Sequence, residues 1–190
     1  MERDDSEREG FVKVYGMWVP DSVSALELEM FHYYHSDEEW EWGSEGERLM
    51  VVGDCEKGVA GMSVDERRGL DHKLPRVEHF YNIVEMLVNR GEKVVERNRW
   101  LDEMVEGMIS YDWCTLAGSG SSGKSFAAAL VSVIDFICDP HESLCLITST
   151  SIKGAQLRVW ASVSRIWNRI PNRDDYGVMQ MTDCRIRGFD

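Results

Sequence analysis

The chain has 190 residues, of which 43% are hydrophobic and seven are tryptophan, and its formal net charge is −13. This composition excludes a disordered chain and fits one domain with an appendage. No apolar run reaches the roughly 18 to 20 residues of a membrane span, and residues 1–10 lack the apolar centre of a signal peptide. We therefore expect a soluble protein of the cell interior, with its five scattered cysteines reduced.

The negative charge is concentrated at the front of the chain. Residues 1–60 hold 16 acidic and 5 basic side chains, whereas residues 151–190 hold four aspartates and seven bases. These bases are Lys153, Arg158, Arg165, Arg169, Arg173, Arg185 and Arg187. The C-terminal part could therefore bind the phosphate backbone of a nucleic acid, which the acidic N-terminal part would repel.

Three regions follow from the pattern along the chain. Residues 1–10 alternate in charge and predict a disordered acidic tail. Residues 11–75 are an N-terminal region of uncertain fold, in which short apolar runs such as FVKVYGMWV and RLMVVG favour short strands and loops. Residues 76–190 form the main domain, after a stretch rich in glycine and charge at 58–75.

Helices and strands alternate in the main domain. Apolar stripes predict helices at 77–89, 100–108, 124–139 and 153–170, the last ended by Pro171. YDWCTLA at 111–117 and LCLIT at 144–148 are typical of strands, the second buried on both faces of a parallel sheet. This order predicts an α/β fold, a P-loop NTPase with a parallel sheet flanked by helices and preceded by a small acidic N-terminal region.

The segment between the first predicted strand and its helix matches GxxxxGK[ST] at every fixed position. Its residues are Gly118, Ser119, Gly120, Ser121, Ser122, Gly123, Lys124 and Ser125. Glycines let successive N–H groups face phosphate oxygens, and the helix that follows directs its N-terminal dipole at the same anion. The pattern predicts a site for ATP and Mg²⁺, in which Lys124 reaches the β and γ phosphates and the Ser125 hydroxyl ligates the metal.

No strand with a terminal acid follows this loop, although hydrolysis by this class of enzyme normally needs one. Asp135 lies on the helix of the loop itself, and Leu49–Asp54 and Val64–Glu66 precede the loop. We expect that the chain stops before its acidic strand, at Asp190, and that this piece binds nucleotide but hydrolyses it poorly. It is therefore uncertain from the residues whether the chain is an enzyme.

Three segments, AGSGSSGKS, CDPHESLCLITSTS and IKGAQLRVWASV, together resemble the ATPase region of large terminase subunits of tailed phages, over roughly residues 97–170. The resemblance implies a homo-oligomeric motor of the host cytoplasm that uses ATP to drive double-stranded DNA into a procapsid, with a small terminase subunit and a portal as partners. Many terminases carry a basic residue inside the loop, whereas this chain has Ser119, Gly120, Ser121 and Ser122 there. The alternatives are another P-loop NTPase, such as a helicase-like translocase or a small-molecule kinase, and a nucleotide-binding module without hydrolysis.

Several other residues admit two interpretations. Arg158, Arg165 and Arg169 could contact DNA or a neighbouring nucleotide, but a solvated helix face is the favoured interpretation. For Trp160 and Trp167 packing is favoured over base stacking, and for His32, His35 and Cys55 a structural role is favoured over a metal site. Thr148–Ser151 could sense the γ phosphate, since ligands of open α/β sheets bind at the ends of strands.

Overall fold

The computed structural model describes residues 11–14, 17–20, 24–35, 74–141, 143–148 and 151–189. These residues divide between two compact units, 1–79 and 80–190. The expected disordered tail at 1–10 lies outside the described residues, as do Cys55 and the two upstream acidic segments, Leu49–Asp54 and Val64–Glu66.

The first unit contains a hairpin and a helix. Strands β1 (Phe11–Val14) and β2 (Met17–Pro20) pair antiparallel, with Val12 opposite Val19. Helix α1 (Ala25–His35) follows in a region where only short strands and loops were expected. It begins at a capping box, because Ser24 Oγ accepts from the N–H of Glu27 at 3.2 Å while Glu27 Oε2 accepts from the N–H of Ser24 at 2.7 Å.

A buried polar pair links α1 to the start of helix α3 (Arg76–Leu87) within this unit. His79 Nδ1 lies 2.6 Å from Glu29 Oε2, and both side chains are fully buried. Because a carboxylate can only accept, His79 Nδ1 donates this hydrogen bond. The ring of His32 stacks on that of His79 with 5.1 Å between centroids, so the structure places His32 in a packed core.

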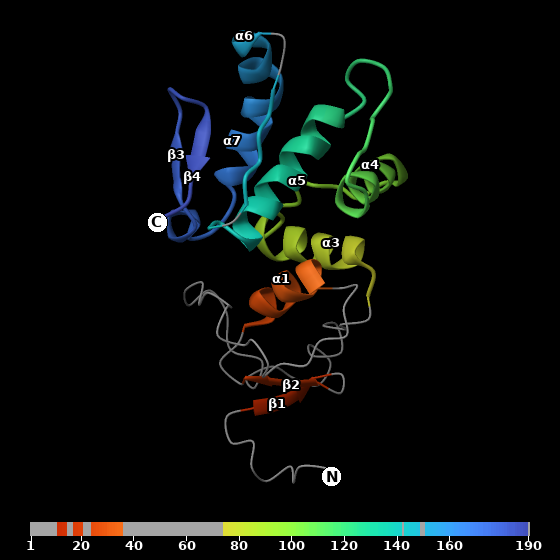
Figure 1. Cartoon of the computed structure of the whole chain (residues 1–190), viewed down its shortest axis with the longest axis vertical. Helices are drawn as coiled ribbons and strands as arrows, with labels where there is room; N and C mark the ends of the chain where they lie inside the picture. Colours follow the sequence, from red (N-terminus) through yellow and green to blue (C-terminus); the bar gives the residue numbers. More distant parts are fainter. Residues whose placement is uncertain are drawn as a thin grey trace. The chain divides into compact units, whose positions relative to one another are not determined.

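Three helices pack together in the core of the second unit. Helix α5 (Lys124–Cys138) packs between α4 (Arg99–Ser110) and α7 (Ala161–Trp167), as Figure 1 shows. Burial is almost continuous along α5, at Ala127, Ala129, Leu130, Val131, Val133, Ile134 and Ile137. The expected helices near 77–89, 100–108 and 124–139 are thus confirmed, with α3 ending at Leu87. The buried stripe of α4 is Leu101, Val105 and Ile109, which leaves Trp100 exposed.

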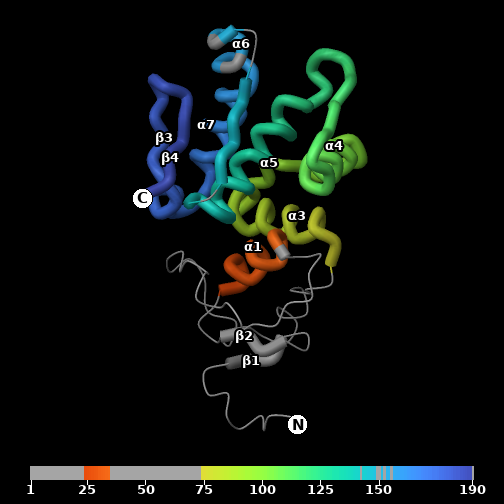
Figure 2. The backbone as a smooth tube through the Cα atoms, in the orientation of Figure 1, coloured from red at the N-terminus to blue at the C-terminus, as the bar shows by residue number. Residues whose placement is uncertain are grey.

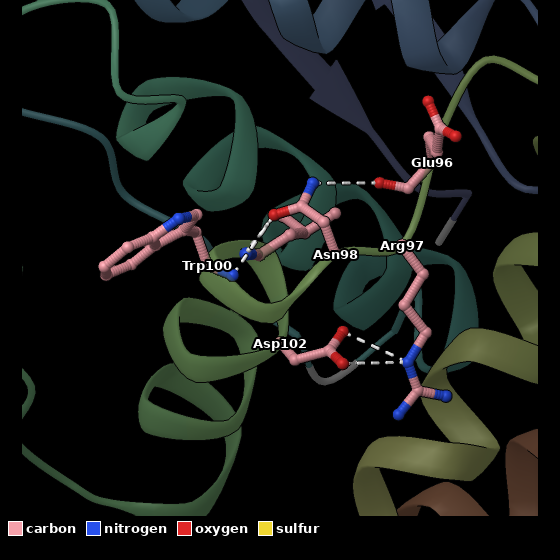
Figure 3. A network of polar contacts seen from close by, with 6 residues as sticks. Glu96, Arg97, Asn98, Trp100 and Asp102 are labelled. Atoms are coloured by element: carbon pink, nitrogen blue, oxygen red, sulfur yellow. Dashed lines mark hydrogen bonds and ion pairs between the residues drawn. The ribbon is translucent and has the colours of Figure 1, made fainter.

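The start of α4 is fixed by side chains on both sides of its first turn (Figure 3). Asn98 Oδ1 accepts from the N–H groups of Trp100 and Leu101, each at 3.1 Å, and so caps the helix. Arg97 Nε donates to both carboxylate oxygens of Asp102, and its guanidinium lies 4.3 Å from the ring centroid of Tyr81. These contacts set where α4 begins.

The C-terminal part contains a segmented helix and a second hairpin. The expected helix at 153–170 appears as α6 (Ile152–Ala155), the π-helical segment η3 (Gln156–Trp160) and α7. After the 3₁₀ turn η4 (Arg173–Asp175), strands β3 (Val178–Gln180) and β4 (Arg185–Arg187) pair antiparallel. This hairpin was not anticipated from the sequence.

The prediction of a parallel sheet flanked by helices is wrong. The described residues are rich in helix, and their strands form two separate antiparallel pairs, β1–β2 and β3–β4. The segments at 111–117 and 144–148 are irregular, and Trp113, Leu144 and Leu146 are 94%, 87% and 80% exposed. A strand requires a neighbour about 4.8 Å away to take up its N–H and C=O groups, and neither segment is paired in a ladder with another described residue.

Candidate phosphate-binding site

The predicted phosphate loop lies between α4 and α5 (Figure 2). It is exposed along most of its length. Gly123 is the N-cap of α5 with φ +88°, a left-handed conformation that glycine adopts without a steric penalty. Ser121 is also left-handed, with φ +63°, whereas Ser122 between them has negative φ. Such alternation turns consecutive N–H groups toward one side, which is the geometry of an anion-binding nest.

The first turn of α5 adds to this positive potential. Gly123 provides no side-chain cap, and the first turn contains no acidic residue. The first backbone bond of the helix runs from the N–H of Ala127 to Gly123 O at 2.9 Å, so the N–H groups before it are available to an anion. The helix dipole favours negative charge at the same place.

Lys124 folds back over the loop. Its Nζ donates to Gly118 O at 2.9 Å, to Ser119 O at 2.7 Å and to Ser122 Oγ at 2.7 Å. A Cβ on Gly118 would lie 3.3 Å from Ser122 Oγ, which is a tight contact, so glycine at this position leaves room for that hydroxyl. The loop therefore brings together the nest, the helix N-terminus and one positive charge.

Ser125 occupies the second position of α5 and is exposed. Its hydroxyl is thus accessible from solvent. Asp135 lies ten residues further along the same helix, which corresponds to about 15 Å, and, together with desolvation of the thiol, its carboxylate raises the pKa of Cys145. Among the described residues, no group of three or more His, Cys, Asp or Glu side chains is arranged to hold a metal by itself.

Cys145 marks the path of the chain after α5. The segment returns along this helix (Figure 2), and Cys145 Sγ donates to Ser132 O at 3.5 Å. Although the residue as a whole is exposed, its Sγ faces α5, and desolvation there, together with the Asp135 carboxylate, raises the pKa of the thiol. The raised pKa lowers the thiolate fraction near pH 8.

We expect Asp135→Asn to accelerate alkylation of Cys145, because losing the carboxylate lowers the thiol pKa and increases the thiolate fraction. Iodoacetamide labelling at pH 8, followed by peptide mass spectrometry, measures the rate. Cys114, which is exposed, serves as the internal reference in the same digest and should label at an unchanged rate. An unaltered rate at Cys145 would show that Asp135 does not control this thiol.

The other residues singled out from the sequence are mostly structural. Trp167 is buried beside the ring of Phe136, with 5.9 Å between centroids, which confirms the packing interpretation. Arg169 pairs with Glu92 at 2.7 Å, while Arg158 and Arg165 are exposed. Ser151 Oγ accepts from the N–H of Gly154 at 3.0 Å at the start of α6. Ser149, Thr150 and the side chain of His35 lie outside the described part of the chain.

Comparisons of the chain with protein-family models, with curated proteins and with solved structures found no match. Within the described residues, no helix has the length and apolar character to cross a membrane.

Proposed function

We propose that residues 118–125 bind the phosphates of ATP as its magnesium complex. The observation that supports this most directly is the position of Lys124 Nζ, which donates to the carbonyl oxygens of Gly118 and Ser119 and so places a positive charge at the loop. A cation, a row of N–H groups and a helix N-terminus then face one anion from several sides. This arrangement is local and does not require a sheet behind it.

Each part of the loop has a distinct task in this proposal. The N–H groups around Gly123 bind phosphate oxygens, and the Lys124 ammonium neutralises charge on the β and γ phosphates. The Ser125 hydroxyl is one ligand of Mg²⁺, whose remaining ligands are water and phosphate oxygens, as is usual for this ion at nucleotide sites.

We propose further that the chain is the ATP-binding part of a phage DNA-packaging motor. Support comes from the resemblance of residues 97–170 to large terminase subunits and from the basic residues of the last forty positions. In this role the protein acts as a homo-oligomer in the host cytoplasm, on double-stranded DNA, together with a small terminase subunit and a portal. A nucleotide-binding module without hydrolysis is the second candidate, since Asp135 is remote from Ser125 along α5.

Titration calorimetry of the whole chain tests the binding step. We expect Mg·ATP and Mg·ADP to bind and AMP to bind far more weakly, because AMP lacks the phosphates that Lys124 reaches. Equal affinity for AMP, or no ATP binding at millimolar concentration, would contradict the site. Phosphate release with and without double-stranded DNA then separates the two roles: DNA-stimulated turnover supports the motor, whereas binding without turnover supports the module.

A further inference from the structure

The ammonium of Lys124 makes three hydrogen bonds within the loop. A lysine ammonium has three N–H donors, and here they meet Gly118 O, Ser119 O and Ser122 Oγ at 2.7 to 2.9 Å. Two of these acceptors are backbone carbonyls, which any residue would provide. The third is a hydroxyl, and it depends on serine at position 122.

The residues on either side of Ser122, Ser121 and Gly123, both have positive φ. Gly118 leaves room for the Ser122 hydroxyl, because a Cβ at position 118 would lie 3.3 Å from its Oγ. Ser119 differs from Ser122, because its carbonyl contacts Lys124 whereas its hydroxyl makes no hydrogen bond with the described residues.

We propose that Ser122 is the positioning residue for Lys124: its hydroxyl holds the ammonium across the loop before a nucleotide arrives. The contribution of Ser122 to ATP affinity rests on the proposed function, whereas its hydrogen bond to Lys124 does not. A lysine side chain that loses one of three bonds regains part of its rotamer freedom, and nucleotide binding must then remove that freedom again. Ser122 therefore increases affinity by preparing the lysine in advance.

Acylation of Lys124 measures this hold directly. The whole chain is treated with a limiting amount of acetic anhydride, and the peptide that contains Lys124 is quantified by mass spectrometry, with the exposed Lys93 and Lys153 as internal references. We expect Ser122→Ala to accelerate acylation of Lys124 several-fold, because a less tightly bonded amine is freer to react. Ser122→Thr keeps the hydroxyl and should restore the slow rate, and Ser119→Ala should leave it unchanged.

Calorimetry with Mg·ATP completes the test. Ser122→Ala should raise the Kd about threefold to tenfold, and Ser122→Thr should restore it. An unchanged acylation rate in Ser122→Ala would overturn the inference. Faster acylation with equal or tighter ATP binding would also overturn it, because the hydroxyl would then compete with phosphate for the ammonium. If the unmodified chain binds no ATP and Mg·ATP does not slow acylation of Lys124, the proposed function fails. The acylation rates of the variants still decide whether Ser122 holds Lys124.

Discussion

Replacement of Lys124 by alanine is expected to weaken Mg·ATP binding roughly 30- to 150-fold. Charge-assisted hydrogen bonds to phosphate contribute about 2 to 3 kcal/mol, and every 1.4 kcal/mol corresponds to a factor of ten. The loss should be larger for ATP than for ADP, because ADP lacks the γ phosphate that this ammonium also neutralises. Titration calorimetry of the two nucleotides gives both values.

The same substitution should leave the fold intact. Lys124 bonds to carbonyls of the exposed residues Gly118 and Ser119, which water can hydrate when the ammonium is absent. We expect the free energy of unfolding to change by less than about 1 kcal/mol. Lys93→Ala removes an equal charge from an exposed position outside the loop and should not alter ATP affinity. Equal weakening in both variants would show that the effect is one of net charge.

Replacement of His79 by leucine is expected to destabilise the first unit by about 3 to 5 kcal/mol. The Glu29 carboxylate would remain buried and would lose the donor that now lies 2.6 Å away, and removing one partner of a buried ion pair has a cost of this order. Hydrogen exchange of peptides from α1, measured by mass spectrometry, reports the free energy of local opening. We expect exchange in α1 to accelerate strongly.

Two further variants separate charge from packing at this pair. Glu29→Gln keeps the shape and offers an amide oxygen to His79 Nδ1, so it should cost far less than His79→Leu. The double variant with leucine at both positions should lose less stability than the sum of the two single leucine variants, because it leaves no buried charge. Additive losses would mean that the pair contributes only through its volume.

Some features that the structure revealed were accessible in the sequence. Ser24 and Glu27 have the spacing of a capping box in front of α1, yet the acidic and aromatic character of this region obscured the helix. Apolar residues four positions apart predicted α4, but two such stripes lie one residue apart in the sequence. One stripe is Trp100, Met104 and Met108, and the other is Leu101, Val105 and Ile109. In the structure the second stripe is the buried one. Ser122 was placed in the phosphate loop, but its bond to Lys124 has no sequence signature.

The sequence by itself determined three helices of this protein and the loop before the last of them. Apolar stripes placed α3, α4 and α5, and glycine and lysine at fixed spacing placed the loop before α5, because such preferences act within a few residues. The tertiary structure decided which residues contact one another and which are buried. Glu29 meets His79 across 50 positions, and Leu144 and Leu146 remain exposed although their apolar run is typical of a buried strand. A run of apolar residues specifies neither its partner nor its burial, since both depend on which surfaces the rest of the chain brings beside it.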